Sequence, residues 1–376
     1  MAITSCRHFN GYKPCGLNPR CDHGCPKRDE PTLRILLIHL GALGAVVRST
    51  ALLAPLRRRF PGAHLTWVTD RPADALLRGH PRIDRVLTTQ EGDILALSAL
   101  EFDVALVVDK SLKASGVLAR TRADLVLGFV AEARTGAILP ANEAARELWS
   151  LGLDDQKKFF VNRKSEIQLT TEALELGPWK RDPYDLPLNE DEKSRRDRRR
   201  AEWSGRGRFR VVGINTGCSP MLPHKKLSVD GHRELIRRLK SDSSLRVVLL
   251  GGPEDGERNR RIADGLNVIL SPTEEGLRDG LVSVAACDAV ITGDSLGLHM
   301  ALSQSVWTVA WFGPSCAHEI EFYGRGEAVL SRASCSPCWK RVCSKELMCY
   351  DQVNFTEIEQ KLRQGLAAWE TTTIRP

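Results

Sequence analysis

The chain has 376 residues, of which 42% are hydrophobic, 6% aromatic and 27% charged, and its formal net charge is +7. This length can bury two cores, no apolar run approaches the roughly 18 residues of a membrane span, and the N-terminus lacks the apolar stretch of a secretory signal. We therefore expect a cytoplasmic protein with two domains and an anionic substrate or membrane surface as its partner, and we expect no nucleic acid.

Eleven cysteines are many for a cytoplasmic protein, and eight of them fall into two groups of four. The first group lies in residues 1–30, which contain Gly and Pro but little apolar pattern, so this segment needs a cross-link to fold. Zinc, iron and an iron–sulfur cluster are all open as the occupant. The predicted ligands are Cys6, Cys15, Cys21 and Cys25.

Strand and helix patterns then alternate over residues 31–188. The run at residues 33–40 is continuously apolar, and a glycine-bearing turn and an apolar-periodic helix at residues 46–60 follow it. Such alternation predicts a doubly wound α/β domain with a parallel sheet. The further segments are strands at 64–68, 85–88, 104–108 and 125–130 and helices at 73–77 and 111–119.

The next segment, residues 189–209, is highly charged and has few core residues, so it is expected to be a solvated helix and an interdomain linker. A second alternation over residues 210–353 predicts another Rossmann-like domain. Its strands are placed at 211–214, 246–250, 268–270 and 288–292, and its helices at 231–239, 257–265, 277–286 and 298–303.

The turn within residues 292–314 carries the strongest functional signal. The segment reads as strand, glycine-bearing turn, helix and a further strand. The turn lies at a helix N-terminus, so free backbone N–H groups and the helix dipole would suit a diphosphate. Asp294 and Ser295 stand where they can cap this helix. An ordinary capped strand-to-helix turn is the alternative reading of this segment alone.

The second cysteine group has the close spacing of a tetrathiolate knuckle that holds Zn²⁺ or a single Fe. Reduced thiols or disulfides are the alternative. A closed shell of four thiolates leaves no position for substrate, so neither group is expected to be catalytic. The predicted ligands are Cys335, Cys338, Cys343 and Cys349.

The last segment, residues 354–376, has apolar residues at helical spacing: Ile358, Leu362, Leu366 and Trp369. Such an apolar stripe is expected to pack against another part of the protein. We expect the helix to cross the junction between the two domains.

Together these motifs resemble glycosyltransferase family 9, the ADP-heptose:lipopolysaccharide heptosyltransferases. The resemblance rests on their order and separation from about Leu33 to Val353: ILLIHLGALGAVVRSTALLAPLRRRFPGAHLTWVTD, VVDKSLKAS, INTGCSP with the following KKLS, LLGGPED, GDSLGLHMA with WFGPS, and CSPCWKRVC. It implies a two-domain GT-B fold facing a central cleft, an ADP-sugar held by the C-terminal domain, an acceptor held by the N-terminal one, and inverting transfer without a catalytic metal.

The resemblance assigns most of the donor site. Lys225 stands at the family's lysine and would stabilise the diphosphate leaving group, although Lys226 beside it is equally open. Asp255 would bond a ribose hydroxyl, with a helix cap as its alternative, and His299 is open to a packing role. The other donor positions are Thr216, Gly217, Gly251, Gly252, Asp294, Ser295, Leu296 and Gly297.

The acceptor side departs from the family. Relatives carry an aspartate general base where this chain has Ala45, and alanine cannot accept a proton. Engineered inactivation, a base shifted elsewhere, and binding without turnover are three open explanations. Asp109, after the strand at 104–108, is the best replacement base, with helix capping as its alternative. Gly44, Arg48 and Lys113 are the expected acceptor-binding residues.

The leading hypothesis is therefore an inverting glycosyltransferase that moves a heptose or related sugar from an ADP-sugar to an anionic glycan or glycolipid, such as the lipopolysaccharide inner core. Peripheral contact with the inner face of the membrane fits that acceptor. The alternatives are a nucleotide-sugar-binding protein with little turnover, heptosyl transfer to a protein or small molecule, and a metal or redox sensor.

Overall fold

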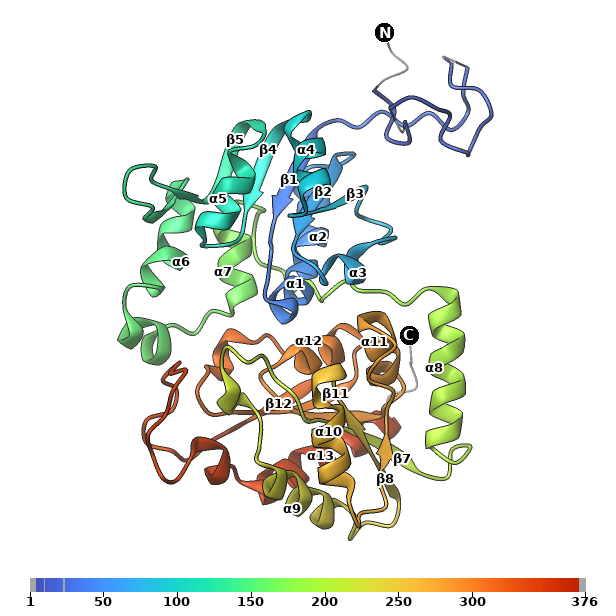
Figure 1. Ribbon diagram of the computed structural model, residues 1–376, viewed down its shortest axis with the longest axis vertical. Coiled ribbons are helices and arrows are strands. Elements are labelled where there is room, and N and C mark those ends of the chain that lie inside the picture. The colour runs from blue at the N-terminus through green and yellow to red at the C-terminus, as the bar shows by residue number, and fades with distance from the viewer. Residues whose placement is uncertain (1–4, 10, 23, 372–376) are drawn as a thin grey trace. The chain divides into compact units, whose positions relative to one another are not determined.

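The computed structural model describes residues 5–9, 11–22 and 24–371 (Figure 1). Two compact units make up the chain. The first contains the described residues up to Gly41 together with Ala51–Lys158 and Gln168–Asp182. The second contains Ala42–Thr50, Phe159–Ile167 and the described residues from Pro183 onward. Among the described residues, no helix is long and apolar enough to cross a membrane.

A six-stranded sheet in the order β3-β2-β1-β4-β5-β6 forms the centre of the first unit. Strands β1 to β5 are parallel, and β6 pairs antiparallel with β5. All six residues of β2 are buried, as expected for a parallel sheet covered on both faces. The strands are β1 (Arg34–Ile38), β2 (His64–Thr69), β3 (Arg85–Thr88), β4 (Glu101–Val107), β5 (Arg122–Ala131) and β6 (Ile138–Pro140).

The helices of the first unit cover this sheet. Leu36, Ile38, Val107 and Val117 belong to one buried cluster between the sheet and α5. The helix predicted at residues 46–60 is interrupted by a 3₁₀ turn, and its two parts, α1 and α2, fall in different units. The helices of this unit are α2 (Leu53–Arg59), α3 (Asp74–Leu77), α4 (Glu91–Ser98), α5 (Leu112–Leu118), α6 (Arg146–Leu151) and most of α7 (Glu166–Ala173).

The second unit contains another six-stranded sheet, in the order β12-β11-β10-β7-β8-β9 with all neighbours parallel. Its central strands are buried β-branched and apolar runs, which need cover on both faces. The strands are β7 (Arg210–Asn215), β8 (Leu245–Leu250), β9 (Ile269–Leu270), β10 (Ala289–Gly293), β11 (Trp307–Phe312) and β12 (Gly326–Leu330).

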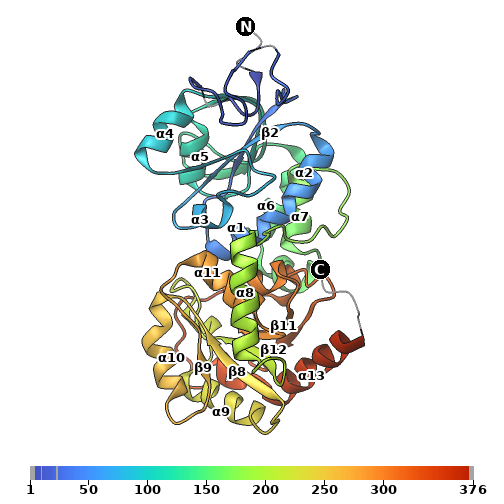
Figure 2. The ribbon, with the colours of Figure 1, turned by 90° about the vertical axis from the view of Figure 1, so that its right-hand side faces the viewer.

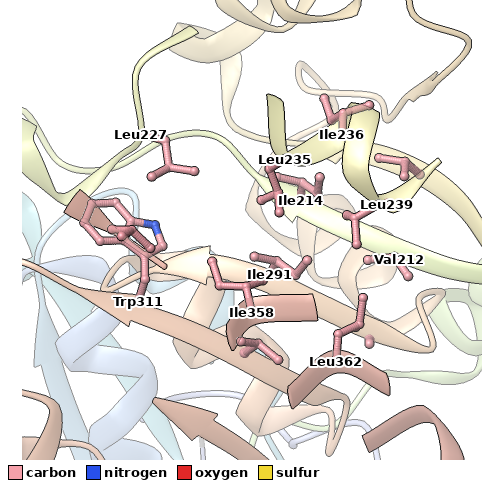
Figure 3. Packing of buried hydrophobic residues seen from close by; sticks show 14 of the residues in the cluster. Val212, Ile214, Leu227, Leu235, Ile236, Leu239, Ile291, Trp311, Ile358 and Leu362 are labelled. Carbon is pink, nitrogen blue, oxygen red and sulfur yellow. The ribbon is translucent and has the colours of Figure 1, made fainter. Parts of the chain in front are cut away.

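Helix α9 illustrates how the sequence forms a helix that packs on this sheet. Ser228 caps the helix by accepting from the Gly231 N–H at 2.9 Å, and the buried residues Leu235, Ile236 and Leu239 form one stripe. Figure 3 shows this stripe facing Val212, Ile214 and Ile291 of the sheet. The helices here are α1 (Leu43–Ser49), α8 (Glu190–Trp203), α9 (Val229–Leu239), α10 (Gly256–Ala263), α11 (Leu277–Ala285), α12 (Leu296–Ser303) and α13 (Phe355–Thr371).

The charged segment at residues 189–209, which the sequence predicts to be a solvated helix and an interdomain linker, contains helix α8, which packs on α11. Asp279 of α11 is 2% exposed and accepts from Arg195 at 2.8 Å and from Arg199 at 3.0 Å. Trp203 is also buried. The predicted helix is therefore present and more than half of its residues are exposed, while its other face packs on α11 through arginine stems and the buried carboxylate of Asp279.

Helix α13 runs beside the sheet of the second unit (Figure 2) and contacts β10, β11 and β12. Ile358 and Leu362 are fully buried in the same cluster as the α9 stripe, and Leu366 packs against it. The side chain of Trp369 lies outside the described residues. The described apolar face of the helix expected to cross the domains therefore packs on its own unit's sheet.

The predicted α/β class with two Rossmann-like sheets is confirmed. The sequence missed β6, β12, α4, α6 and α7, all short or weakly patterned elements. Helix α4 illustrates the reason, because only Leu97 among its eight residues is buried. Without a regular apolar stripe there is no periodic signal to detect.

Candidate functional site

The second sheet reverses its direction of strand addition between β7 and β10. In open α/β sheets such a reversal leaves a crevice at the carboxyl ends of the two strands, where ligands bind. Asn215 is the last residue of β7 and Gly293 is the last residue of β10, and α12 begins three residues later. The segments 215–217 and 292–297 therefore meet at this end of the sheet.

Asn215 ties these two segments together. Its amide Nδ2 lies 2.9 Å from the Gly217 carbonyl, 2.9 Å from Ser295 Oγ and 3.3 Å from Thr292 Oγ1. The two hydroxyls are 3.1 Å apart and bond each other. The turn after β10 is thus fixed to the end of β7 by a small polar network before any ligand binds.

A mostly buried ion pair joins this turn to the preceding loop. Lys225 Nζ lies 2.6 Å from Asp294 Oδ2, and the two side chains are 14% and 12% exposed. Burial by itself would raise the pKa of Asp294, but Lys225 and then His299 act in the opposite direction and the net pKa is lowered. Of the two adjacent lysines, Lys225 is therefore the one that the structure brings to this turn.

The N-terminus of α12 receives no hydrogen bond from the side chain of its N-cap residue, Ser295. The expectation that Asp294 and Ser295 cap this helix is wrong, because Asp294 pairs with Lys225 and the Ser295 hydroxyl bonds Asn215 and Thr292. The N–H groups of an uncapped N-terminus remain available to bind an anion, and the helix dipole adds partial positive charge there. This geometry suits a phosphate group.

Three glycines allow the segments to approach this closely. A Cβ atom on Gly293 would lie 1.9 Å from the Lys225 carbonyl oxygen, one on Gly297 would lie 2.6 Å from Asn215 Cγ, and one on Gly217 would lie 2.0 Å from Asp255 Oδ2. Real Cβ atoms do not tolerate such distances. Glycine is therefore required by packing at all three positions.

A buried polar group lies behind α12. Tyr184 Oη is 3.2 Å from His299 Nδ1, and Arg48 Nη2 is 2.7 Å from Glu166 Oε2. Burial, reinforced by Arg48, lowers the pKa of His299 to about 3, so the imidazole is neutral near pH 7. His299 therefore acts in the structure as a buried hydrogen-bonding group, which the sequence left open.

Two predicted acceptor residues lie beside this group in the second unit. A Cβ on Gly44 would be 2.6 Å from His299 Cδ2, which shows how closely the start of α1 approaches α12. The Arg48 side chain is only 12% exposed and is paired with Glu166. Ala45, half-buried, follows Gly44 in the same helix. The structure thus groups residues 42–50 with the donor residues, whereas the sequence assigned them to the N-terminal domain.

The turn after β8 contains the other predicted donor residues. The Asp255 carboxylate is 4% exposed and accepts from the Gly252 N–H at 3.0 Å, so it closes the turn that begins at Gly251. Burial raises its pKa, while the bond from Gly252 acts in the opposite direction. Thr216 is fully buried and its hydroxyl bonds Asn259 and the Leu250 carbonyl. Both side chains hold the turn in shape.

The first sheet has its own reversal, between β1 and β4, and Asp109 lies there. Its Oδ2 accepts the backbone N–H of Leu40, which follows β1, whereas the cap of α5 is Ser111, whose Oγ accepts from Ala114 N at 3.2 Å. Asp109 is therefore not a helix cap. Burial raises its pKa to about 6 despite the bond from Leu40. Lys113, in the same unit, pairs with Asp70 at 2.7 Å.

Comparison with known proteins identifies the family of this chain. The model of glycosyltransferase family 9 (heptosyltransferase) matches residues 94–349, more than half of the chain. The chain belongs to glycosyltransferase family 9. Lipopolysaccharide heptosyltransferase 2 of Escherichia coli is 24% identical over 309 residues, covering 75% of this chain and 83% of that protein.

Solved structures agree on the GT-B fold of this family. The ADP-heptose lipopolysaccharide heptosyltransferase II of E. coli superposes with a TM-score of 0.62 at 19% identity, covering 90% of this chain and all of the other. The iron-containing dodecameric heptosyltransferase TibC superposes with a TM-score of 0.54 at 12% identity, covering 91% of this chain and 78% of TibC.

Each group of four cysteines in this family 9 chain lines one small cavity. Cys6, Cys15, Cys21 and Cys25 line the first, and Cys335, Cys338, Cys343 and Cys349 line the second. All eight are free thiols. Within the described ranges, however, no three His, Cys, Asp or Glu side chains already have an arrangement that could hold a metal ion. The thiols converge, which suits a soft metal, without forming a finished shell.

Sequence reasoning missed Asn215, Glu166 and Tyr184. Asn215 stands in the quoted INTGCSP motif, at the end of a strand where a polar residue is itself a signal. Glu166 begins α7, which the sequence missed, and Tyr184 lies in an irregular segment. No spacing connects them with Arg48 or His299. Their roles depend on contacts that only the folded chain makes.

Gly297 provides a test of this packing. Gly297→Ala is expected to lower the free energy of unfolding by about 1–3 kcal/mol, because the new Cβ must displace Asn215. Gly280→Ala in α11 is the matched control. No atom outside its local helix backbone lies within 4 Å of a Cβ there, so it should be neutral or stabilise by up to about 1 kcal/mol. Urea unfolding measures both, and equal effects would contradict the packing role of Gly297.

Proposed function

We propose that this family 9 protein transfers a heptose, or a related sugar, from an ADP-sugar to a hydroxyl of an anionic glycan or glycolipid, such as the lipopolysaccharide inner core, with inversion at the sugar carbon. The observation that carries the proposal is the uncapped N-terminus of α12 beside the Lys225–Asp294 pair. The donor and acceptor named for the E. coli relatives, ADP-heptose and lipopolysaccharide, supply the chemical class.

In this proposal the donor diphosphate meets the N–H groups at the start of α12, at the end of the second sheet. When the bond from the sugar carbon to the diphosphate oxygen breaks, negative charge grows on the leaving ADP. Lys225 Nζ, held in a mostly buried place, offsets that charge. Asp294 keeps the lysine in position, since it pairs with the ammonium before the donor arrives.

The acceptor hydroxyl loses its proton as its oxygen attacks the sugar carbon. Asp109 is the proposed base, because Ala45 has no group that can take the proton. A carboxylate whose pKa is about 6 is a stronger base than an ordinary aspartate and is still mostly ionised at pH 7. Lys113 is proposed to meet acidic groups of the acceptor, and the net charge of +7 favours such a partner.

The proposal places the protein in the cytoplasm, at the inner face of the membrane where a glycolipid acceptor is presented. Asp255, Gly251 and Gly252 would adjoin the nucleoside of the donor. The mechanism requires no catalytic metal: the lysine and the helix terminus supply the positive charge. Ala45 favours a second function, binding of an ADP-sugar with little turnover.

Nucleotide selectivity tests the donor site directly. Calorimetric titration with ADP, ADP-heptose, ADP-glucose, UDP-glucose and GDP-mannose is expected to show binding of ADP and ADP-heptose and much weaker binding of the other nucleotide classes. Binding is the right observable because it does not depend on the base. Absence of binding across the whole panel would leave the fold and remove the proposed function.

The pH dependence of kcat/KM tests Asp109. Activity should rise with pH through an apparent pKa of about 6 and then level off, since the base must be ionised. Asp109→Asn should lower turnover by about 10²–10⁴-fold with ADP-heptose affinity retained. Because the folded pKa is raised, Asp109 contributes stability below pH 4 that is lost as the pH rises to about 6, so the asparagine variant should be the more stable protein at pH 7.

Ala45→Asp is the companion variant. If Asp109→Asn keeps full turnover and Ala45→Asp raises it, the base does not reside at position 109. If turnover stays undetectable in the wild type and in Ala45→Asp over a broad acceptor panel, the binding function is favoured instead.

We also propose that each cysteine group binds one structural metal ion, zinc or iron, because four free thiols line each cavity. Burial and the other three cysteines raise the pKa of Cys349 to about 11, and burial and the other three cysteines also raise that of Cys21. These are the consequences of four thiols held close together. A cation would relieve that repulsion and cross-link the segment.

Elemental analysis of protein purified without chelators is expected to find two metal equivalents per chain. Cys15→Ser and Cys338→Ser should each lose one equivalent, whereas Cys218→Ser, which lies in neither group, should retain both. A visible absorption spectrum would identify iron, and a colourless protein with two equivalents would identify zinc. A wild type that contains no metal would contradict the assignment.

A further inference from the structure

The segment that carries the C-terminal cysteine group also contacts the lysine of the proposed donor site. We call residues 335–350 the cysteine knuckle. The ring of Trp339, which stands between Cys338 and Lys340 in this knuckle, lies 4.9 Å from Lys225 Nζ. That distance is within the range of an attractive cation–π contact. The lysine of the proposed donor site thus has two partners, the Asp294 carboxylate and an aromatic face.

The backbone of Trp339 is held in a conformation that a large side chain rarely adopts. Its φ is +51°, in the left-handed region that favours glycine. Its N–H donates to the Pro314 carbonyl at 2.8 Å, and the Cys338 N–H donates to the same oxygen at 3.1 Å. The surrounding structure therefore imposes the position of this residue, which points to a role for the ring.

The knuckle is anchored to the segments that follow β11 and β12. The Ser336 hydroxyl bonds the Gly313 carbonyl, and the Ser331 hydroxyl bonds the Cys349 carbonyl at 2.6 Å. A Cβ on Gly313 would lie only 2.7 Å from Cys349 Sγ, so the cysteine packs directly on that glycine. These contacts anchor the chain on both sides of Trp339, a residue that is 38% exposed, to the carboxyl end of the sheet.

A second aromatic contact reaches the turn that carries the lysine. This 3₁₀ turn, η5 (Pro223–Lys225), contains His224, whose ring stacks on Tyr350 of the knuckle with centroids 6.3 Å apart and an interplanar angle of 26°. One end of the knuckle therefore contacts the lysine side chain and the other end contacts the preceding residue. The turn is held at two points.

We propose that the cysteine knuckle, through Trp339, positions Lys225 for the leaving diphosphate. A free lysine side chain carries about 2 kcal/mol of rotamer entropy that must be lost when it meets a phosphate. The aromatic face restrains the side chain in advance without offering a negative charge that would compete with the donor. Trp339 is a positioning residue, and its role rests on the proposed function of Lys225.

The test compares Trp339→Leu, which removes the π face but retains apolar bulk, with Trp339→Phe, which keeps a smaller face. With ADP-heptose as donor, Trp339→Leu is expected to lower kcat by about 3- to 30-fold, and Trp339→Phe to stay within about 3-fold of the wild type. ADP affinity, measured by calorimetry, should fall more in Trp339→Leu than in Trp339→Phe. If Trp339 had only a structural role, both variants would have a lower melting temperature, but their kcat and ADP affinity would stay close to those of the wild type.

Phe209→Leu is the matched control, because Phe209 makes a cation–π contact with Arg246 at 4.2 Å in the same unit and belongs to no proposed site. It should leave kcat and ADP affinity unchanged. If Trp339→Leu keeps kcat and ADP affinity within about 2-fold of the wild type, or if the phenylalanine variant fails as badly as the leucine variant, the positioning role is wrong.

A readout that needs no donor separates this inference from the proposed function. In lysine-labelled protein, the ε-methylene NMR signal of Lys225, assigned with Lys225→Arg, should be shifted by the indole ring current and should move in Trp339→Leu. An unmoved signal overturns the inference even when the enzyme is active. A wild type that binds no ADP-sugar overturns the proposed function, and the NMR shift then decides whether Trp339 restrains Lys225.

Discussion

The ion pair between Lys225 and Asp294 is the interaction on which the rest of the second unit's site depends. Both side chains are mostly buried, so separating them would leave a charge without compensation at a cost of about 3–5 kcal/mol. The pair joins the loop after β7 to the turn after β10. Around it, Gly293 allows the lysine carbonyl to approach the turn, and Asn215 fixes the turn to β7.

The same constraint explains why the start of α12 remains uncapped. Asp294 and Ser295 are residue types that usually cap helices. Here, however, the Asp294 carboxylate pairs with Lys225. The Ser295 hydroxyl bonds Asn215 and Thr292. A helix end without a cap is less stable by about 1 kcal/mol, and that cost is acceptable where an anionic ligand takes the place of the cap. The arrangement gives up a local stabilisation and leaves the start of α12 open to the diphosphate of the proposed donor.

Strand order accounts for the placement of the candidate residues in each unit. Both sheets reverse beside a central strand, and in both the polar groups gather at the carboxyl ends of the two strands that flank the reversal. In the first unit this brings Asp109 to the backbone of Leu40, and in the second it brings Asn215 to Ser295. Ala45 carries no group that could accept a proton, and the first sheet places the carboxylate of Asp109 at its own reversal.

Much was determined by the sequence alone: two alternating α/β units, a strand-to-helix turn at residues 292–297, and two groups of thiols. These are local or periodic signals, and local spacing decides them. Only tertiary structure selected Lys225 over Lys226, turned Asp294 from a cap into an ion-pair partner, assigned residues 42–50 to the second unit, and placed Trp339 on the lysine. Those outcomes depend on contacts between residues tens to hundreds of positions apart, whose energies no local pattern encodes.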